Sequence, residues 1–366
     1  MPADTLDLLN LVPEPPLRDL TETEIKAFEL DGAVLVRGVI PSSWVSHVAD
    51  AIDHMTSHLT PYGEFLSSSA HRMYTDLFMW QYDDAFRDFV FRSPAARIAA
   101  QALRSDRINF LVDQMFKKDI GCKVPTQWHT DDIAWPVRGS KLMNIWFACD
   151  EATTENSSLQ FVRGSHQLTT RRTQPRHDTR TDERLAKALA ELGWKPTVVE
   201  PLELDEPVTT PALMRAAFQW VHQRFEQEMI DAPLPAELHG LISIEPNRDA
   251  LPIISWDVEP GDAIIFHPGI LHYSTGNEKG ASARRALTTR WLGSDTTYFP
   301  SPGNTPLLWD HGLRPGDGFG GPLFPQILPG VIESEVSARF LGPRPGNPEV
   351  GYRDLRFRVD LDRHGI

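Results

Sequence analysis

The chain contains 30 prolines and 24 glycines among its 366 residues, and they are widely spread. Proline removes a backbone donor and glycine favours turns, so both residues interrupt helices and strands. We therefore expect many short elements joined by turns. The sequence contains neither GxGxxG nor GxxxxGKS, and few predicted strands alternate with helices. An antiparallel barrel or jelly roll flanked by helices therefore fits better than a doubly wound nucleotide-binding fold.

Apolar periodicity predicts a series of helices and strands. Thr21 and Glu24 have capping-box spacing at the start of the first helix, and Asp31-Gly32 ends it. The predicted helices are 22–30, 42–59 and 86–104. The predicted strands are 33–39, 107–116, 142–149, 158–162, 253–258, 263–267 and 286–292.

Residues 171–254 differ from the rest of the chain. They contain two predicted helices, 182–192 and 212–229, separated by proline-rich sequence. Because strand-like sequence resumes afterwards, we interpret this section as a helical insertion and a candidate substrate lid within one domain, 1–366. The expected parts are an N-terminal arm (1–18), N-terminal helices and first half of the core (19–170), the insertion (171–254), second half (255–296) and a C-terminal cover (297–366).

The composition excludes several classes of protein. With 36 basic and 50 acidic residues the formal net charge is −14, which disfavours nucleic acid as a partner. No apolar run reaches about 18 residues, so no membrane-spanning helix is expected. The start of the chain lacks the order of a signal peptide, and two cysteines cannot form a disulfide framework. We therefore expect a cytoplasmic protein.

A candidate metal site lies in the segment TQWHTDDIAWPV. His129 and Asp131 are two residues apart, so on an extended segment they point to the same side. His272 follows far downstream. Two histidines and one carboxylate on one face of a ferrous ion leave up to three positions for a keto acid and dioxygen. An HxD pair alone is a weak signal, so its context decides the interpretation.

Five ordered segments supply that context. They are LTETEIKAFELDGAVLVRGVI, QWHTDDIAWPV, NIWFACDEATTENSSLQFVRGSH, EPGDAIIFHPGILHYSTGN and RRALTTRW. Together they resemble the phytanoyl-CoA dioxygenase family of Fe(II)/2-oxoglutarate oxygenases. The resemblance runs from Thr21 to about Gly293 and leaves out the insertion and the tail. It implies a mainly β fold with flanking helices. The core would be a double-stranded β-helix, which is a cupin-like jelly roll.

The resemblance also implies a set of site residues and cofactors. His129, Asp131 and His272 would bind Fe(II), with 2-oxoglutarate as co-substrate and O2 as oxidant. Residues expected at the co-substrate are Ser274, Trp146 and Arg284. Gln114 lies on the strand before the HxD segment, and we add it to the co-substrate contacts. Lys117 and Lys118, near the end of that strand, are further candidates for a contact with 2-oxoglutarate or substrate, but a solvated strand end is the favoured interpretation for each lysine.

The sequence departs from the family pattern at three points. Arg163 replaces the usual proline before Gly-Ser-His, the insertion lengthens the separation of Asp131 and His272, and the spacing to Arg284 is about one residue longer than usual. Arg285 is therefore the rival anchor for 2-oxoglutarate. Neighbours on a strand face opposite sides, and the apolar residues that share a face with Arg285 favour its burial. The family pattern favours Arg284, which we prefer.

Other candidate residues receive less weight. His267, five residues before His272, is a possible exchanged ligand, and Asp132 would point away from Asp131 on an extended segment. His166 is interpreted as a turn residue. The arginines of the segment 171–180 are interpreted as a solvated loop rather than an anion site.

These features predict a 2-oxoglutarate-dependent dioxygenase that acts on a small-molecule substrate and releases succinate and CO2. Asp131 occupies the position where related halogenases have a small residue, so hydroxylation is favoured over halogenation. Desaturation, cyclisation and epoxidation need the same ligands and stay open, as does the oligomeric state. The alternative is a metal-binding jelly roll without oxygenase activity, such as a cupin-like isomerase, a hydrolase or a sensing module.

Overall fold

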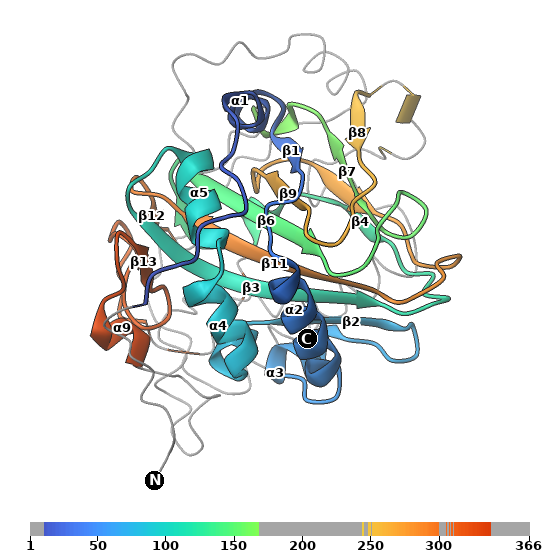
Figure 1. Ribbon diagram of the computed structural model, residues 1–366, viewed down its shortest axis with the longest axis horizontal. Coiled ribbons are helices and arrows are strands. Elements are labelled where there is room, and N and C mark those ends of the chain that lie inside the picture. Colours follow the sequence, from blue (N-terminus) through green and yellow to red (C-terminus); the bar gives the residue numbers. More distant parts are fainter. Residues whose placement is uncertain are drawn as a thin grey trace, which may run out of the picture.

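The computed structural model describes residues 11–167, 244, 248–249, 251–299, 305, 307, 309 and 311–337. In this part of the chain, two antiparallel sheets form the core and helices cover one of them (Figure 1). The predicted insertion helices at 182–192 and 212–229 lie outside the described residues. Within the described ranges, no helix combines the length and apolarity needed to cross a membrane.

The larger sheet has seven strands in the order β1-β9-β6-β11-β3-β13, with β2 also paired to β3. The bounds of these strands are β1 Ala33–Val36, β2 Met73–Leu77, β3 Ile108–Lys118, β6 Leu142–Ala148, β9 Ala263–Phe266, β11 Arg284–Leu292 and β13 Gln326–Leu328.

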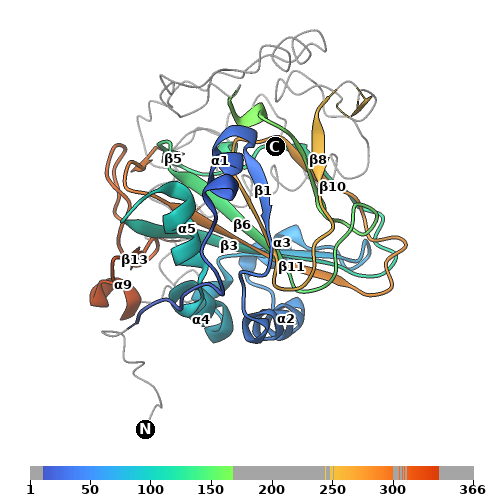
Figure 2. The same ribbon diagram turned by 45° about the horizontal axis from the view of Figure 1, so that its top comes forward.

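The smaller sheet has the order β4-β10-β7-β8, and a two-stranded ribbon pairs β12 with β5. These strands are β4 Thr126–His129, β5 Val137–Arg138, β7 Leu159–Val162, β8 Ile253–Ser255, β10 His272–Ser274 and β12 Thr297–Tyr298. Both sheets unite strands from the two sides of the insertion, as a jelly roll requires. The turned view of Figure 2 shows β8 and β10 at the side of the larger sheet.

The described helices include α1 Glu22–Asp31, α2 Ser42–Thr56, α3 Pro61–Leu66, α4 Asp84–Arg92, α5 Ala95–Leu103 and α9 Glu333–Ser337, with short 3-10 turns η2 Met79–Gln81, η3 Asp131–Ile133 and η4 Ser165–Gln167. The predicted capping box of α1 is present: the Glu24 backbone N–H donates to the Thr21 side chain, and the Glu24 carboxylate accepts from the Thr21 backbone N–H at 2.7 Å. Gly32 then ends α1 with a φ of 83°, and a Cβ there would lie 2.3 Å from Nδ1 of His166.

The single helix predicted over 86–104 is wrong. Two helices, α4 and α5, are separated by Ser93 and Pro94. Proline cannot donate to the preceding turn and pushes the residue before it out of the helical region, and Ser93 has a ψ of 164°. The apolar periodicity runs through both helices, so it predicted one helix although the proline interrupts the backbone between them.

Two apolar cores lie on opposite faces of the larger sheet. The outer core joins the sheet to α2, α4 and α5 (Figure 1), and there the rings of Phe89 and Phe147 stack with centroids 5.4 Å apart. The inner core lies between the two sheets and includes Trp146, Phe161 and Ala286. This separation defines which side chains of each strand face the interior of the jelly roll.

The described parts of both termini are held against the sheets. Residues 11–18 have no regular structure, but the Trp44 indole donates to the Glu14 carboxylate at 2.9 Å and the Leu17 N–H donates to the Val39 carbonyl. In the C-terminal part, β13 extends the larger sheet, and a further apolar cluster combines it with early residues. That cluster includes Tyr62, Phe78, Trp135, Trp309, Phe319 and Phe324.

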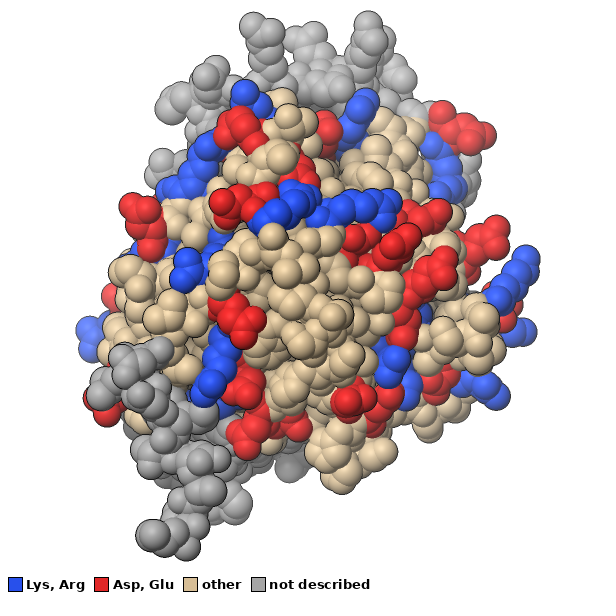
Figure 3. Space-filling model, viewed as in Figure 1, with Lys and Arg blue, Asp and Glu red and all other residues tan. Residues whose placement is uncertain are grey.

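Surface charges of both signs are interspersed. On the face shown in Figure 3, blue basic side chains lie beside red acidic ones. Ion pairs such as Arg18–Glu24 and Arg37–Asp262, both at 2.6 Å, are examples of this pairing.

Candidate active site

Strand pairing brings His129 and His272 together. They end β4 and begin β10, and the antiparallel register places their Cα atoms directly opposite each other. Their ring centroids are 4.1 Å apart. Residues that are far apart in the sequence are thus adjacent because the smaller sheet joins the two halves of the core.

Both imidazole rings are oriented by backbone carbonyls. Nδ1 of His129 lies 2.7 Å from the Gln127 carbonyl oxygen, and Nδ1 of His272 lies 2.9 Å from that of Ile270. A carbonyl oxygen only accepts, so each Nδ1 carries the proton and each Nε2 keeps its lone pair. The two Nε2 atoms lie 3.4 and 3.8 Å from Oδ1 of Asp131.

Asp131 begins the short turn η3, which is anchored to the loop before β10. The Asp131 N–H donates to the Pro268 carbonyl at 2.7 Å. Burial alone would raise the pKa of the Asp131 carboxyl, but the charge of Arg290 holds that pKa well below its usual range. Burial, reinforced by His129, lowers the pKa of His272 to about 3. Asp131 is therefore a carboxylate and His272 a neutral imidazole, the forms that bind metal.

The donor set fits a divalent transition metal. Among the described residues, His129, Asp131 and His272 are the one group of three or more His, Cys, Asp or Glu side chains whose ligand atoms all lie within 4.8 Å. Two imidazoles and one carboxylate are typical of non-haem Fe(II) oxygenases. The side chain of His129 is 34% exposed, against 9% for Asp131 and 6% for His272, so the group opens on the His129 side.

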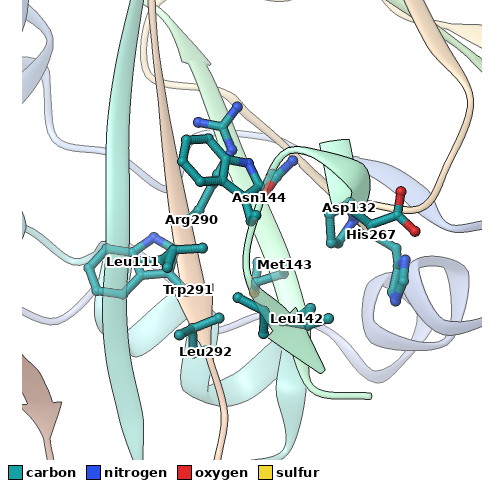
Figure 4. A pocket seen from close by; sticks show the side chains of 12 residues that line it. Leu111, Asp132, Leu142, Met143, Asn144, His267, Arg290, Trp291 and Leu292 are labelled. Atoms are coloured by element: carbon teal, nitrogen blue, oxygen red, sulfur yellow. The ribbon is translucent and has the colours of Figure 1, made fainter. Parts of the chain in front are cut away.

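The rival ligands lie elsewhere. Nδ1 of His267 accepts from the Gly269 N–H at 3.0 Å, and the His267 ring lies 5.3 Å from that of His166. His267 and Asp132 line one side of a small cavity, across from Arg290 and Asn144 (Figure 4). Neither His267 nor Asp132 belongs to the group formed by the three predicted ligands.

Arg284 faces the interior of the jelly roll. It is 2% exposed, its Nη2 donates to Ser157 Oγ at 2.8 Å, and its guanidinium lies 5.7 Å from the centre of the Trp146 ring. Its Nε and Nη1 atoms are buried without a hydrogen-bond partner. Arg285 faces outward instead, where it forms ion pairs at 2.7 Å with both Asp150 and Asp53.

Lys118 lies beside Arg284 and is fully buried, so the expectation of a solvated strand end is wrong for this residue. The register of β3 and β11 pairs the two residues directly. The Lys118 ammonium donates to Ser274 Oγ at 3.1 Å, to Thr126 Oγ1 at 3.2 Å and to the Thr275 carbonyl at 2.7 Å. Burial, and then the charge of Arg284, lowers the pKa of Lys118 well below its usual value.

Arg284 and Lys118 are adjacent buried cationic side chains without a counter-charge. Among the residues that the structure describes, neither has a carboxylate within ion-pair distance. Buried charges are normally paired, because removing them from water is costly. The unpaired guanidinium atoms therefore fit the carboxylate of a ligand. The sequence named Lys118 as a candidate contact but favoured a solvated strand end for both lysines, because no local pattern separates Lys118 from Lys117, which pairs with Asp53.

The remaining predicted residue, Gln114, contacts other polar side chains. Its Oε1 accepts from Arg290 Nη2 at 2.7 Å, and its Nε2 donates to Thr75 Oγ1 at 3.2 Å. Arg290 and Asn144, which sequence reasoning did not place at the site, both donate to Asp131. Strand alternation puts Arg284 and Arg290 on one face of the predicted strand, and this pattern could have indicated that Arg290 faces the interior together with Arg284.

Solved structures support the fold. The crystal structure of the non-heme alpha ketoglutarate dependent carbocyclase SnoK from nogalamycin biosynthesis matches with a TM-score of 0.56 and 17% identity, covering 84% of this chain and 96% of SnoK. The epimerase SnoN from the same biosynthesis matches with a TM-score of 0.55 and 16% identity, covering 84% of this chain and 95% of SnoN. At these identities the likeness concerns the fold alone.

Sequence comparison provides the classification. No curated protein matches the chain. The family model for phytanoyl-CoA dioxygenase (PhyH) matches residues 28–286, which is more than half of the chain and spans all three candidate metal ligands. The chain therefore belongs to the phytanoyl-CoA dioxygenase (PhyH) family.

Proposed function

We propose that this protein is an Fe(II)/2-oxoglutarate-dependent dioxygenase that hydroxylates an unactivated C–H bond of a small molecule. The observation that carries the proposal is a combination: a two-histidine, one-carboxylate group, and, in the same interior, a buried arginine that lies beside a buried lysine and has no carboxylate partner among the described residues. The first is suited to iron and the second to the far carboxylate of a dicarboxylic acid. Ferrous iron with 2-oxoglutarate supplies oxidation by O2, with release of succinate and CO2.

The histidines and Asp131 would hold the metal. The carbonyls of Gln127 and Ile270 keep each Nε2 directed at the common point, and Oδ1 of Asp131 completes the set. The three ligand atoms lie within 4.8 Å of one another, as a preorganised metal site requires.

Arg284, whose Nε and Nη1 have no protein partner, would bind the far carboxylate of 2-oxoglutarate. Lys118 adds a second positive group, Ser274 Oγ holds the ammonium in place, and the Trp146 ring forms a wall beside the guanidinium. All four side chains are buried, so water has little access to them and each electrostatic contact is stronger. A monocarboxylate co-substrate would leave the two cationic groups without their anion.

The substrate would approach from the side of His129, because that ligand is much more exposed than the other two. The buried position of Arg284 separates the co-substrate's anchor from that opening. This arrangement lets the protein bind 2-oxoglutarate first and the substrate afterwards, so that oxidation is coupled to the presence of substrate.

The first experiment distinguishes this proposal from a metal-binding jelly roll without oxygenase activity. 2-Oxoglutarate should raise the melting temperature only when a divalent metal is present, and succinate should form in air with Fe2+ once a substrate is supplied. An equal thermal shift without metal, or none with it, would contradict the proposal. Oxalate, which lacks a second carboxylate at the right distance for Arg284, serves as the control ligand.

The second experiment identifies the reaction. With 18O2, one labelled atom should enter succinate and one the hydroxylated product. SnoK is a carbocyclase and SnoN an epimerase, so ring closure or epimerisation is the alternative outcome, recognised by a product without labelled oxygen. Because Asp131 occupies the carboxylate position, a chlorinated product would contradict the assignment.

A further inference from the structure

The two oxygen atoms of Asp131 have different surroundings. Oδ1 faces the Nε2 atoms of His129 and His272 at 3.4 and 3.8 Å. Oδ2 accepts hydrogen bonds from Asn144 Nδ2 at 2.6 Å and from Arg290 Nη2 at 3.1 Å. One oxygen is therefore directed at the metal position, and the other is held from behind by two donors.

The two donors come from a rigid part of the fold. Asn144 on β6 and Arg290 on β11 are direct Cα partners in the larger sheet, and they are 1% and 4% exposed. Figure 4 shows their side chains next to each other at one end of the cavity. Gln114 and the Trp135 ring further fix Arg290, at 2.7 and 4.9 Å.

A carboxylate can bind a metal through one oxygen or through both. Free rotation about the last bond of an aspartate side chain would let both oxygens reach the ion and occupy two positions. Two hydrogen bonds to Oδ2 fix the plane of the carboxylate and use the lone pairs of that oxygen. They therefore favour binding through Oδ1 alone and leave one more position open for a ligand.

We propose that Asn144 and Arg290 are positioning residues that hold Asp131 as a one-oxygen metal ligand. This inference rests on the metal site of the proposed function. A rival account treats Arg290 only as the counter-charge of a buried carboxylate. In that account any cation at position 290 suffices, and Asn144 does not matter to the metal.

Four proteins separate the two accounts: the parent, Asn144→Leu, Arg290→Lys and Arg285→Lys. Asn144→Leu removes one donor at similar volume without changing charge. Arg290→Lys keeps the charge and loses the planar fork. Arg285→Lys is the matched control, because Arg285 lies on the same strand and pairs with Asp150, away from the metal ligands. Each metal-free protein is titrated with Co2+, whose visible absorption reports coordination geometry without any turnover.

We expect Asn144→Leu and Arg290→Lys each to weaken Co2+ binding about tenfold and to change the absorption spectrum. Tenfold is the lower end of the loss in metal affinity that follows when a hydrogen-bond partner of a metal ligand is removed. Arg285→Lys should match the parent. Parent-like affinity and spectrum in Asn144→Leu or in Arg290→Lys would overturn the inference and leave the proposed function standing. If Asn144→Leu does not fold, Arg290→Lys decides alone. A parent protein that fails to bind Co2+ would overturn the proposed function and the inference with it.

Discussion

Arg284 and Arg290 lie at opposite ends of β11 and both face the interior of the jelly roll, but their guanidinium groups have different partners. Arg290 forms an ion pair with Asp131 at 3.1 Å. Arg284 donates to a serine hydroxyl and has the buried ammonium of Lys118 nearby, but among the described residues it has no carboxylate partner. In both arginines Nε and Nη1 have no hydrogen-bond partner, so the difference lies in the ion pair. The same residue type on the same face of one strand thus has a carboxylate partner at one end and, among the described residues, none at the other.

The difference indicates what each arginine does. A buried charge whose partner belongs to the protein contributes to the arrangement of that partner, here a metal ligand. A buried charge without a partner costs free energy that a bound anion can recover. We therefore assign the Arg290 end to the metal and the Arg284 end to the co-substrate, and four predictions test that division.

The largest effect is expected from the partner of Arg290. Asp131→Ala removes one of three metal ligands and leaves Arg290 buried without its counter-charge, so Fe2+ binding and succinate formation should fall to background. Asp132→Ala is the matched control, because Asp132 is the adjacent carboxylate and lies outside the ligand group. Metal titration and succinate assays check both variants. Turnover by Asp131→Ala, or equal loss in both variants, would contradict the assignment.

At the other end, Arg284→Ala should raise the KM for 2-oxoglutarate more than tenfold. The far carboxylate would lose its charged partner in a buried pocket, at a cost of about 2–5 kcal/mol. Arg285→Ala should change KM little, because Arg285 pairs with Asp150 and Asp53 on the outside. Steady-state kinetics with varied 2-oxoglutarate compare the two. The reverse pattern would transfer the anchor to Arg285.

A smaller effect is expected from Lys118→Met, which keeps the length of the side chain but removes its charge. The three donors of Lys118 already reach Ser274, Thr126 and Thr275, so the variant loses a nearby positive charge rather than a hydrogen bond to the keto acid. We expect KM for 2-oxoglutarate to rise about tenfold, which corresponds to about 1.4 kcal/mol. Lys117→Met is the control, because that lysine lies at the surface and pairs with Asp53. An unchanged KM in Lys118→Met would show that Arg284 binds the keto acid without it.

Much of this division could be predicted from the sequence, because it depends on local patterns. The HxD spacing, the downstream histidine and the family resemblance predicted three candidate metal ligands, which the structure brings together. The alternation of β11 left Arg284 and Arg285 as the two candidates for the anchor. Burial by apolar neighbours favoured Arg285, but the structure places Arg284 inside and Arg285 in an ion pair. The polar interior of the site, rather than an apolar core, explains why counting apolar neighbours failed there.

Contacts between distant strands were beyond sequence reasoning. Asn144 and Arg290 reach Asp131 only because β6 and β11 pair in one register. Lys118 is buried only because β3 continues to its pairing with Arg284. Each of these residues is typical of a surface when considered alone, so no pattern in its own segment marks it as interior.

The last prediction concerns a third buried carboxyl next to the Arg290 end. Asp113 on β3 is the Cα partner of Thr289, and it is fully buried. Its Oδ2 accepts from the Trp80 N–H at 2.9 Å, while its Oδ1 has no hydrogen-bond partner. Arg290 pairs with Asp131 and not with Asp113. Burial therefore dominates and raises the pKa of Asp113 to about 8, whereas the pKa of Asp131 is lowered.

This difference has a definite sign in stability. In the unfolded chain Asp113 ionises with a pKa of about 3.9, so between there and about 8 the folded state binds the extra proton. The free energy of unfolding should therefore decrease as the pH rises through this window, by about 1.4 kcal/mol for each pKa unit at most.

Asp113→Asn mimics the protonated acid and should remove most of the decrease between pH 5.5 and 8.5. Denaturant unfolding of the metal-free protein measures it, with Asp50→Asn on the exposed side of α2 as control. If the parent and Asp113→Asn lost stability equally over this range, Asp113 would have to be ionised in the folded protein and compensated by a cation. The two buried carboxyls, Asp113 and Asp131, would then no longer differ in the direction of their pKa shifts.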